Sequence, residues 1–170
     1  SWDVDVVRKC ASVSAKEAYA AGIKWTFAPM VDIARDPRWG RIMEGYGEDP
    51  YLCSEMAKDA VEGYQGDYIG QKEKLIACAK HFVTYGACIG GRDYNSADMS
   101  VQTLHDIYIP PFKAAFDAGA ATCMAAFNDF NGVPCTCNKY LLKEVLLKQL
   151  GFEGVVISDA GAVVELIPHN

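Results

Sequence analysis

The chain has 170 residues, about one domain, and it is 51% hydrophobic and 22% charged, which is typical of a folded globular protein. Sixteen Lys and Arg against 22 Asp and Glu give a formal net charge of −6, which argues against a protein that binds nucleic-acid phosphates. No apolar run reaches the roughly 18–20 residues that cross a bilayer, so no membrane partner is expected.

Cysteine usage gives a weak indication of the compartment. The seven cysteines are odd in number and scattered through apolar segments, so they are interpreted as buried free thiols in a reducing, cytoplasmic compartment. A periplasmic or secreted location stays open. Cys135 and Cys137 lack the spacing of a zinc site, and no metal is expected. The start at Ser1, without an initiator Met, favours a piece of a longer protein.

The first half of the chain reads as a helix, a strand and a second helix. Apolar residues at helical spacing predict a helix over Val4 to Ala21, ended by Gly22. The segment from Ile23 to Ile33 is rich in β-branched and aromatic residues and is predicted to be a buried strand. Asp49 and Pro50 are a favourable cap and first residue for the next helix.

The second half continues the alternation. Strands are predicted from Leu75 to Val83, from Ala121 to Phe127 and from Gly154 to Ser158. Ser100 caps a helix that Pro110 and Pro111 break or kink, with a resumption over Phe112 to Ala118. An Asn131-Gly132 turn follows the third strand, and Asn138 then caps a helix through Leu150.

Alternating strands and helices predict an α/β fold with parallel strands. Four strands cannot close a barrel. The alternatives are a compact open sheet or about half of a (β/α)8 TIM barrel, in either case as a single domain over 1–170.

Functional groups in such folds gather after the strands, and polar residues follow each predicted strand. They are Asp36, Arg38 and Arg41 after the first, Lys80 and His81 at the second, Asn128 after the third and Asp159 after the fourth. Cationic donors around one acid suit a polyhydroxylated or anionic ligand. Asp159 is the candidate for the chemistry, although the same position could cap a helix from Ala160 to Ile167.

Two further predictions concern neighbouring side chains. Lys80 and His81 are adjacent in a strand and should point to opposite faces, so only special backbone geometry brings both into one site. The glycines at 90 and 91 could carry Arg92 toward the pocket. Met124 and Phe127 belong to an apolar strand and are predicted to be core, although Phe127, near the strand end, could stack on a sugar ring.

Several motifs together resemble glycoside hydrolase family 3. They are Ala28-Pro29-Met30-Val31-Asp32, Asp36-Pro37-Arg38-Trp39-Gly40-Arg41, Glu44-Gly45-Tyr46-Gly47-Glu48-Asp49-Pro50, Lys80-His81-Phe82, Gly91-Arg92-Asp93-Tyr94-Asn95, Ala125-Ala126-Phe127-Asn128-Asp129-Phe130-Asn131-Gly132 and Gly154-Val155-Val156-Ile157-Ser158-Asp159. They occur in family order across nearly the whole chain.

The resemblance implies a retaining β-glycosidase, acting on β-D-glucosides or β-xylosides, on a TIM barrel followed by a second domain. It implies that Asp159 is the nucleophile, and that no metal or organic cofactor is needed. Arg41, Lys80 and His81 are implied to hold the sugar hydroxyls. Pocket-wall roles for Arg92, Met124 and Phe127 are weaker implications. The general acid/base is implied to come from the second domain, so this chain alone is expected to be inactive.

Two other functions remain open on the sequence. A strand-end lysine in a barrel suits a Schiff-base aldolase with Lys80 as its nucleophile. Alternatively, the chain is a non-catalytic piece that at most binds sugar weakly, or does not fold at all because a half barrel leaves two parallel strand edges unpaired. The family often has Trp after the nucleophile, where this chain has Ala160, so the resemblance leaves the acceptor preference open.

Overall fold

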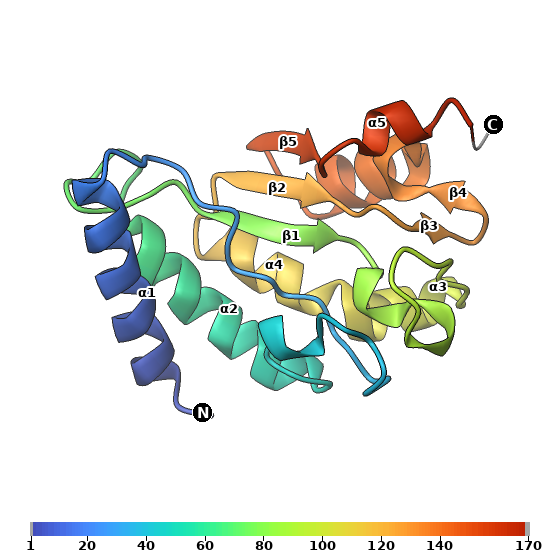
Figure 1. Ribbon diagram of the computed structural model, residues 1–170, viewed down its shortest axis with the longest axis horizontal. Helices are drawn as coiled ribbons and strands as arrows, with labels where there is room; N and C mark the ends of the chain where they lie inside the picture. Colours follow the sequence, from blue (N-terminus) through green and yellow to red (C-terminus); the bar gives the residue numbers. More distant parts are fainter. Residues whose placement is uncertain (1, 169–170) are drawn as a thin grey trace.

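The computed structural model describes residues 2–168 and is built on a three-stranded parallel sheet (Figure 1). The strands are β1 (Cys78–Phe82), β2 (Thr122–Ala125) and β5 (Val155–Ser158), in the order β1-β2-β5. Helices connect them and α4 (Pro110–Asp117) packs on β1. The α/β prediction with parallel strands is confirmed.

The first two helices follow the sequence closely. α1 (Val4–Ala20) begins where the Asp3 carboxylate accepts a hydrogen bond from the Val6 N–H. α2 (Pro50–Gln65) begins after Asp49, whose Oδ1 accepts from the Leu52 N–H at 2.7 Å. The two helices pack against each other at one end of the molecule, and α2 also packs against α4 (Figure 1).

The predicted strand over 23–33 is not a regular strand, which corrects the sequence interpretation. The segment lies parallel to β1 but forms only two isolated bridges, Trp25 with Ile76 and Met30 with Lys80. Pro29 lies between them and has no N–H to donate, so a continuous ladder cannot form. The neighbouring hydrogen bonds, such as Val31 N–H to the Lys80 carbonyl at 2.8 Å, still hold the segment beside β1.

The predicted break at the paired prolines is confirmed. The chain forms a short α3 (Val101–Thr103), a π-helical turn (Leu104–Tyr108) and then α4 from Pro110. The Ile109 N–H donates to the Leu104 carbonyl, which is the longer π-type hydrogen bond. Proline lacks the donor that would continue the earlier register, so the helix restarts there.

The Asn131-Gly132 turn joins a small hairpin that the sequence analysis did not include. β3 (Asp129–Phe130) and β4 (Val133–Pro134) pair antiparallel, and positive φ angles of 50° and 83° at the two turn residues are those of a tight hairpin turn. Asn138 then caps a helix over Tyr140–Gln149, as predicted, although its turns are π-helical. The final helix is short, α5 (Ala162–Glu165).

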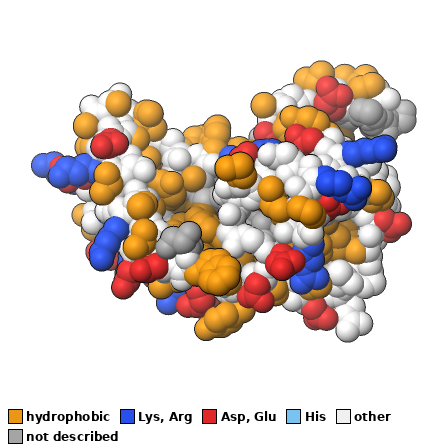
Figure 2. Space-filling model, turned by 60° about the horizontal axis from the view of Figure 1, so that its bottom comes forward, with side chains coloured by type: hydrophobic (Ala, Val, Ile, Leu, Met, Phe, Trp, Pro, Cys, Tyr) orange, Lys and Arg blue, Asp and Glu red, His pale blue; other side chains and the backbone are white. Residues whose placement is uncertain are grey.

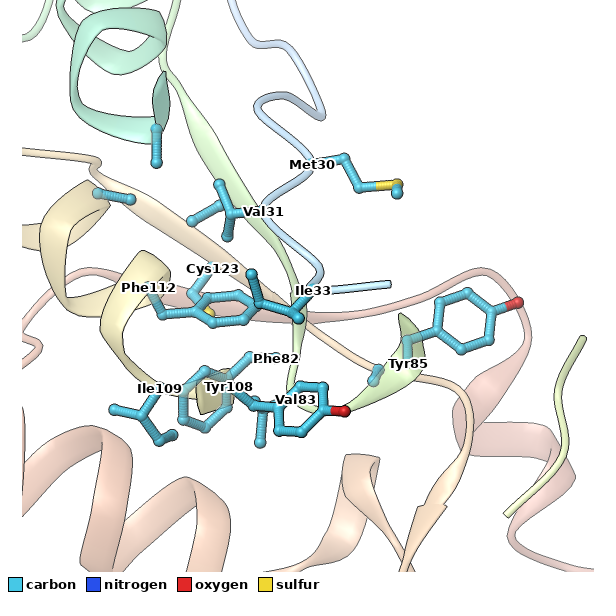
Figure 3. Packing of buried hydrophobic residues seen from close by; sticks show 14 of the residues in the cluster. Met30, Val31, Ile33, Phe82, Val83, Tyr85, Tyr108, Ile109, Phe112 and Cys123 are labelled. Carbon is cyan, nitrogen blue, oxygen red and sulfur yellow. The ribbon is translucent and has the colours of Figure 1, made fainter. Parts of the chain in front are cut away.

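The core lies between the sheet and its helices. Phe82 of β1 meets Phe112 of α4 edge to face, with ring centroids 5.1 Å apart. Ile33, from the extended segment beside β1, belongs to the same cluster, whereas Tyr85 points away from these rings (Figure 3). The core therefore fixes β1 and the segment beside it, which together carry several of the candidate site residues.

The surface and the thiols agree with part of the sequence interpretation. All seven cysteines are free, five are buried, and only Cys10 and Cys137 are exposed. Burial raises the pKa of the Cys88 and Cys135 thiols to about 12. Basic and acidic side chains are mixed over the face seen in Figure 2. Within the described residues, none of the helices is long and apolar enough to cross a membrane.

Candidate active site

The candidate site lies where β1 and β5 end, and Asp159 is at its centre. Asp159 directly follows β5, and its Oδ2 atom is 3.5 Å from Nε2 of His81. Oδ1 accepts a hydrogen bond from the Ala160 N–H at 2.7 Å. Oδ2 is buried and has no hydrogen-bond partner among residues 2–168. One oxygen is thus fixed by the backbone, and the other has no hydrogen-bond partner in the described chain.

The alternative role of Asp159 as a helix cap is not what the structure shows. α5 begins at Ala162 rather than at Ala160, and its N-cap residue is Gly161, with a φ of +75°. No side-chain cap hydrogen bond is present at this helix. The Asp159 carboxylate is therefore not used to start the helix.

His81 enters the site because the β1 ladder is irregular at this residue. Lys80 is paired with Met124 and Phe82 with Ala125, so the register shifts and His81 is left out of the ladder. The peptide bond between Lys80 and His81 is cis. The regular alternation of side chains is interrupted here, which is the special backbone geometry that the sequence analysis required.

Lys80 lies at the edge of this group. It is half-buried, and its side chain forms no ion pair or hydrogen bond with another described residue. Its charge nevertheless acts on Glu44, whose pKa it helps to lower after the larger effect of Arg41. A free ammonium group at this place is available to a polar ligand.

Arg41 brings the guanidinium to the histidine. Its Nε and Nη2 atoms donate to the two carboxylate oxygens of Glu44 at 2.7 and 2.8 Å, a bidentate pair that lowers the pKa of Glu44. Its Nη1 atom lies 3.3 Å from Nε2 of His81. The same pairing raises the pKa of Arg41, so this side chain is a permanent cation.

Aromatic residues form the wall behind these groups. The Tyr85 ring meets the His81 ring edge to face at 5.0 Å, and the Arg41 guanidinium lies over Tyr85 at 5.5 Å. Burial raises the pKa of Tyr85, which keeps the phenol neutral. Trp39 is buried behind Tyr85 and donates to Asp93 at 3.0 Å.

The three weaker candidates take different positions. Met124 is buried in β2, between Lys80 of β1 and Ile157 of β5 in the ladder. Phe127 is half-buried and meets the Tyr94 ring at 5.3 Å, beside a hollow of about 440 Å³ that Ala160 also lines. Arg92 is exposed, and its side chain makes no polar contact within the described chain, so the structure does not bring it to Asp159.

Other polar residues after the strands serve the fold instead. Asp36 and Arg38 pair with each other at 2.7 Å, and the Arg38 side chain is 72% exposed. Asn128 is buried and donates to Thr84 and to the Asp129 carbonyl. None of these three contacts reaches Asp159.

The sequence analysis missed Asp32 as a site residue. Asp32 is 2% exposed, and its Oδ2 atom accepts from the His81 backbone N–H at 3.0 Å and lies 2.8 Å from Nδ1 of the ring. A carboxylate at the end of an apolar run was the available signal. The partner lies 49 positions away in the chain, so spacing alone does not reveal it.

Fold and site together define a parallel α/β domain, with a carboxylate beside an imidazole and a guanidinium at the ends of its strands. Residues 1–170 match the family model described as the glycosyl hydrolase family 3 N terminal domain. The chain belongs to this family, as the motif resemblance indicated.

Several relatives cover the whole chain. The periplasmic beta-glucosidase of Salmonella typhimurium is 48% identical over 170 residues, which are 100% of this chain and 22% of the relative. A beta-xylosidase of Formosa agariphila is 43% identical over 98% of this chain and 24% of its own length. The chain therefore spans about a quarter or less of the length of these relatives.

A solved structure agrees closely with the fold. The beta-glucosidase from Listeria innocua in complex with glucose superposes with a TM-score of 0.97 at 50% identity. The match covers 99% of this chain and 24% of that protein. A second structure of that Listeria innocua enzyme, in complex with isofagomine, also superposes on this chain with a TM-score of 0.97, at 49% identity.

Proposed function

We propose that this chain carries the nucleophile and part of the sugar site of a retaining β-glycosidase that removes terminal β-D-glucosyl or β-xylosyl residues. The observation that carries the proposal is the Asp159 carboxylate, with one oxygen fixed by the Ala160 N–H and the other buried beside His81 without a hydrogen-bond partner in the described chain. Such an oxygen is available to attack an anomeric carbon.

The proposed reaction has two displacements. In the first, Asp159 Oδ2 bonds to the anomeric carbon while the bond to the aglycone oxygen breaks, and that oxygen takes a proton from a general acid. In the second, water gives its proton to the resulting base and displaces Asp159, which restores the configuration. Arg41, Lys80 and His81 hold the sugar hydroxyls, and their charges and dipoles strengthen these contacts in the transition state.

The general acid/base is proposed to lie outside this chain. A retaining enzyme needs its second carboxyl group about 5–5.5 Å from the nucleophile. Glu44 is the carboxylate nearest to Arg41, but both of its oxygens are held by that guanidinium, which keeps it ionised and unsuited to donate a proton. We expect a later domain to supply the acid, and the 170-residue chain alone to show little or no turnover.

The three-stranded sheet is proposed to be part of a (β/α)8 barrel, with 1–170 a partial domain. The segment beside β1 continues the parallel arrangement through its hydrogen bonds with Ile76 and Lys80. On the other side, the described part of the chain pairs β5 with β2 only, and Val155 and Val156 of β5 are exposed by 60% and 38%. Apolar side chains on an outer strand fit burial by further strands.

The two alternatives differ in their support. The relatives named above are a beta-glucosidase and a beta-xylosidase, which favours glycoside hydrolysis over a Schiff-base aldolase that uses Lys80. Borohydride trapping with a keto substrate would leave an adduct on Lys80 only in the aldolase. A non-catalytic sugar-binding role predicts binding without any covalent intermediate.

The test is covalent trapping in the whole protein that carries this chain. A 2-deoxy-2-fluoro β-glucosyl reagent with an activated leaving group needs no acid for its first step, so the glycosyl–enzyme accumulates. We expect an intact-mass increase that peptide mapping assigns to Asp159, and no increase in Asp159→Asn. A label on another residue, or none on a folded and ligand-binding protein, would exclude Asp159 as nucleophile.

The compartment is a further prediction. Seven free thiols fit the cytoplasm, whereas the Salmonella relative is named periplasmic. Fractionation of cells that express the whole protein from its own gene distinguishes a cytoplasmic from a periplasmic location.

A further inference from the structure

We propose that Asp32 is a positioning residue that holds the His81 ring in the form with its proton on Nδ1, so that Nε2 accepts a hydrogen bond from Arg41 and donates none to Asp159. The inference rests on the proposed function and deepens it, because it assigns a role to a buried acid that does not touch the reacting atoms.

The contacts of Asp32 fix His81 at two points. A single oxygen, Oδ2, accepts from the His81 backbone N–H at 3.0 Å and lies 2.8 Å from the ring atom Nδ1. Both side chains are only 1% exposed, so water does not compete for these hydrogen bonds. Because the backbone N–H and the ring nitrogen of His81 contact the same oxygen, both the position and the rotation of the ring are fixed relative to Asp32.

The neighbours of the ring determine which nitrogen carries the proton. An ionised carboxylate only accepts, so the proton between Asp32 and Nδ1 belongs to the imidazole. A guanidinium only donates, so Nε2, which is 3.3 Å from Nη1 of Arg41, offers its lone pair. Asp32 and Arg41 therefore select the same neutral tautomer from opposite sides of the ring.

This tautomer matters for Asp159. Nε2 is 3.5 Å from Asp159 Oδ2, close enough for a small shift to make a hydrogen bond if Nε2 carried a proton. Such a bond would stabilise the carboxylate and weaken it as a nucleophile. With the proton held on Nδ1, Nε2 accepts from Arg41 Nη1, and Asp159 Oδ2 stays free of a hydrogen bond from the ring.

The first experiment is a double-mutant cycle in the whole protein. In Asp32→Ala, the His81 N–H and Nδ1 both lose their acceptor, so the ring is no longer held with its proton on Nδ1 and we expect kcat/KM for an aryl β-glucoside to fall roughly 10- to 100-fold. In a His81→Ala background the same substitution should cost less than about threefold, because no imidazole is left to orient. Full additivity of the two losses would overturn the proposal.

A matched control separates orientation from burial of charge. Asp59, on α2, is also a buried acid and is 7% exposed. Its Oδ1 atom lies 3.1 Å from Nε of Arg8. Asp59→Ala should lower the melting temperature and leave kcat/KM of the folded enzyme unchanged. An Asp32→Ala protein that is folded and keeps kcat/KM within twofold of the parent would overturn the proposal.

A second measurement needs neither activity nor a folded Asp32 variant. Nitrogen-15 NMR of the unmutated whole protein with labelled histidine distinguishes protonated from unprotonated ring nitrogens, and the loss of signals in His81→Ala identifies those of His81. We expect Nδ1 protonated and Nε2 unprotonated, and a protonated Nε2 would refute the proposal. Because this measurement does not depend on catalysis, it stands even if the covalent trapping fails to label Asp159.

Discussion

Two clusters of hydrogen-bonded polar side chains lie at opposite ends of the same parallel strands. The strand-start cluster consists of Gln65, Thr122 and Trp25. Gln65 Oε1 accepts from the Ala77 and Ala121 N–H groups, and Thr122 accepts from the Trp25 indole N–H and donates to the Ala77 carbonyl. The side-chain polar atoms of this cluster are paired with one another or with backbone groups.

The strand-end cluster consists of Asp32, Arg41, His81 and Asp159. It is also hydrogen-bonded, but Oδ1 of Asp32 and Oδ2 of Asp159 have no hydrogen-bond partner in the described chain. An unpaired buried oxygen costs stability, so the same sheet is satisfied at one end and incompletely satisfied at the other. Under the proposed function, this difference means that the polar groups at the strand starts stabilise the fold and those at the strand ends bind a ligand.

The largest expected effect sharpens this comparison at the strand-end cluster. Arg41→Lys removes the bidentate pair with Glu44 and the contact with His81, because an ammonium cannot reproduce the planar fork. We expect kcat/KM of the whole enzyme to fall roughly 10- to 100-fold, with little change in melting temperature. Initial rates with an aryl β-glucoside measure this.

Arg8→Lys is the matched control for that change. Arg8 lies on α1 and pairs with Asp5, Asp59 and Glu62. The same chemical change there should leave kcat/KM unaltered. If Arg41→Lys lowered the melting temperature and not the rate, the strand-end cluster would be a structural device like its counterpart.

The second prediction addresses the strand-start cluster. Gln65→Leu leaves the Ala77 and Ala121 N–H groups without their acceptor, and we expect a loss of about 2–4 kcal/mol in the free energy of unfolding. Thermal or urea denaturation of the whole protein measures the loss. Gln102→Leu, on exposed helix surface, is the control with little expected change. Activity per folded molecule should be retained, and its loss would contradict the division of roles.

The smallest effect concerns an ion pair near the strand ends that lies outside the cluster. The hydrogen bonds from Arg38 lower the pKa of Asp36 from 3.8 to about 2. A depressed carboxyl pKa stabilises the folded state above the unfolded value of about 3.8, and this stabilisation is lost as pH falls toward 2. Arg38→Gln should therefore remove this small stabilisation at pH values above about 4, and the difference from the parent protein should disappear as pH falls toward 2.

Carboxyl carbon-13 NMR checks this prediction, with Asp36→Asn identifying the signal. The Asp36 pKa should rise in Arg38→Gln and stay low in Arg35→Gln, because Arg35 bonds to the Glu48 carbonyl instead. An unchanged Asp36 pKa in Arg38→Gln would show that the local backbone, rather than the guanidinium, holds it down.

Features set by nearby residues were predictable from the sequence. Asp49 and Pro50 start α2, the paired prolines restart the helix at α4, and Asn131-Gly132 makes a tight turn, because each depends on backbone chemistry within a few positions. The family resemblance also led us to expect His81 and Asp159 in one site; the two side chains lie 3.5 Å apart, and their shared role stays a prediction.

Features set by distant contacts were not predictable in the same way. The segment over 23–33 has strand composition, but Pro29 interrupts its pairing with β1. Side chains along a regular strand alternate between the two faces of the sheet, but this alternation is interrupted at His81, where the register between β1 and β2 shifts. The Asp32–His81 contact joins residues 49 positions apart, so only the fold places them together.

The buried thiols have a consequence for following the opening of this domain. Cys10 and Cys137 are exposed and can react at once with an alkylating reagent, whereas the other five are shielded, and burial raises the pKa of Cys88 and Cys135 to about 12. A buried, protonated thiol reacts only after local or global unfolding exposes it. Mass spectrometry can follow the alkylation of each of the five shielded cysteines. Each rate then reports how often the helix, strand or loop that carries the cysteine unfolds locally.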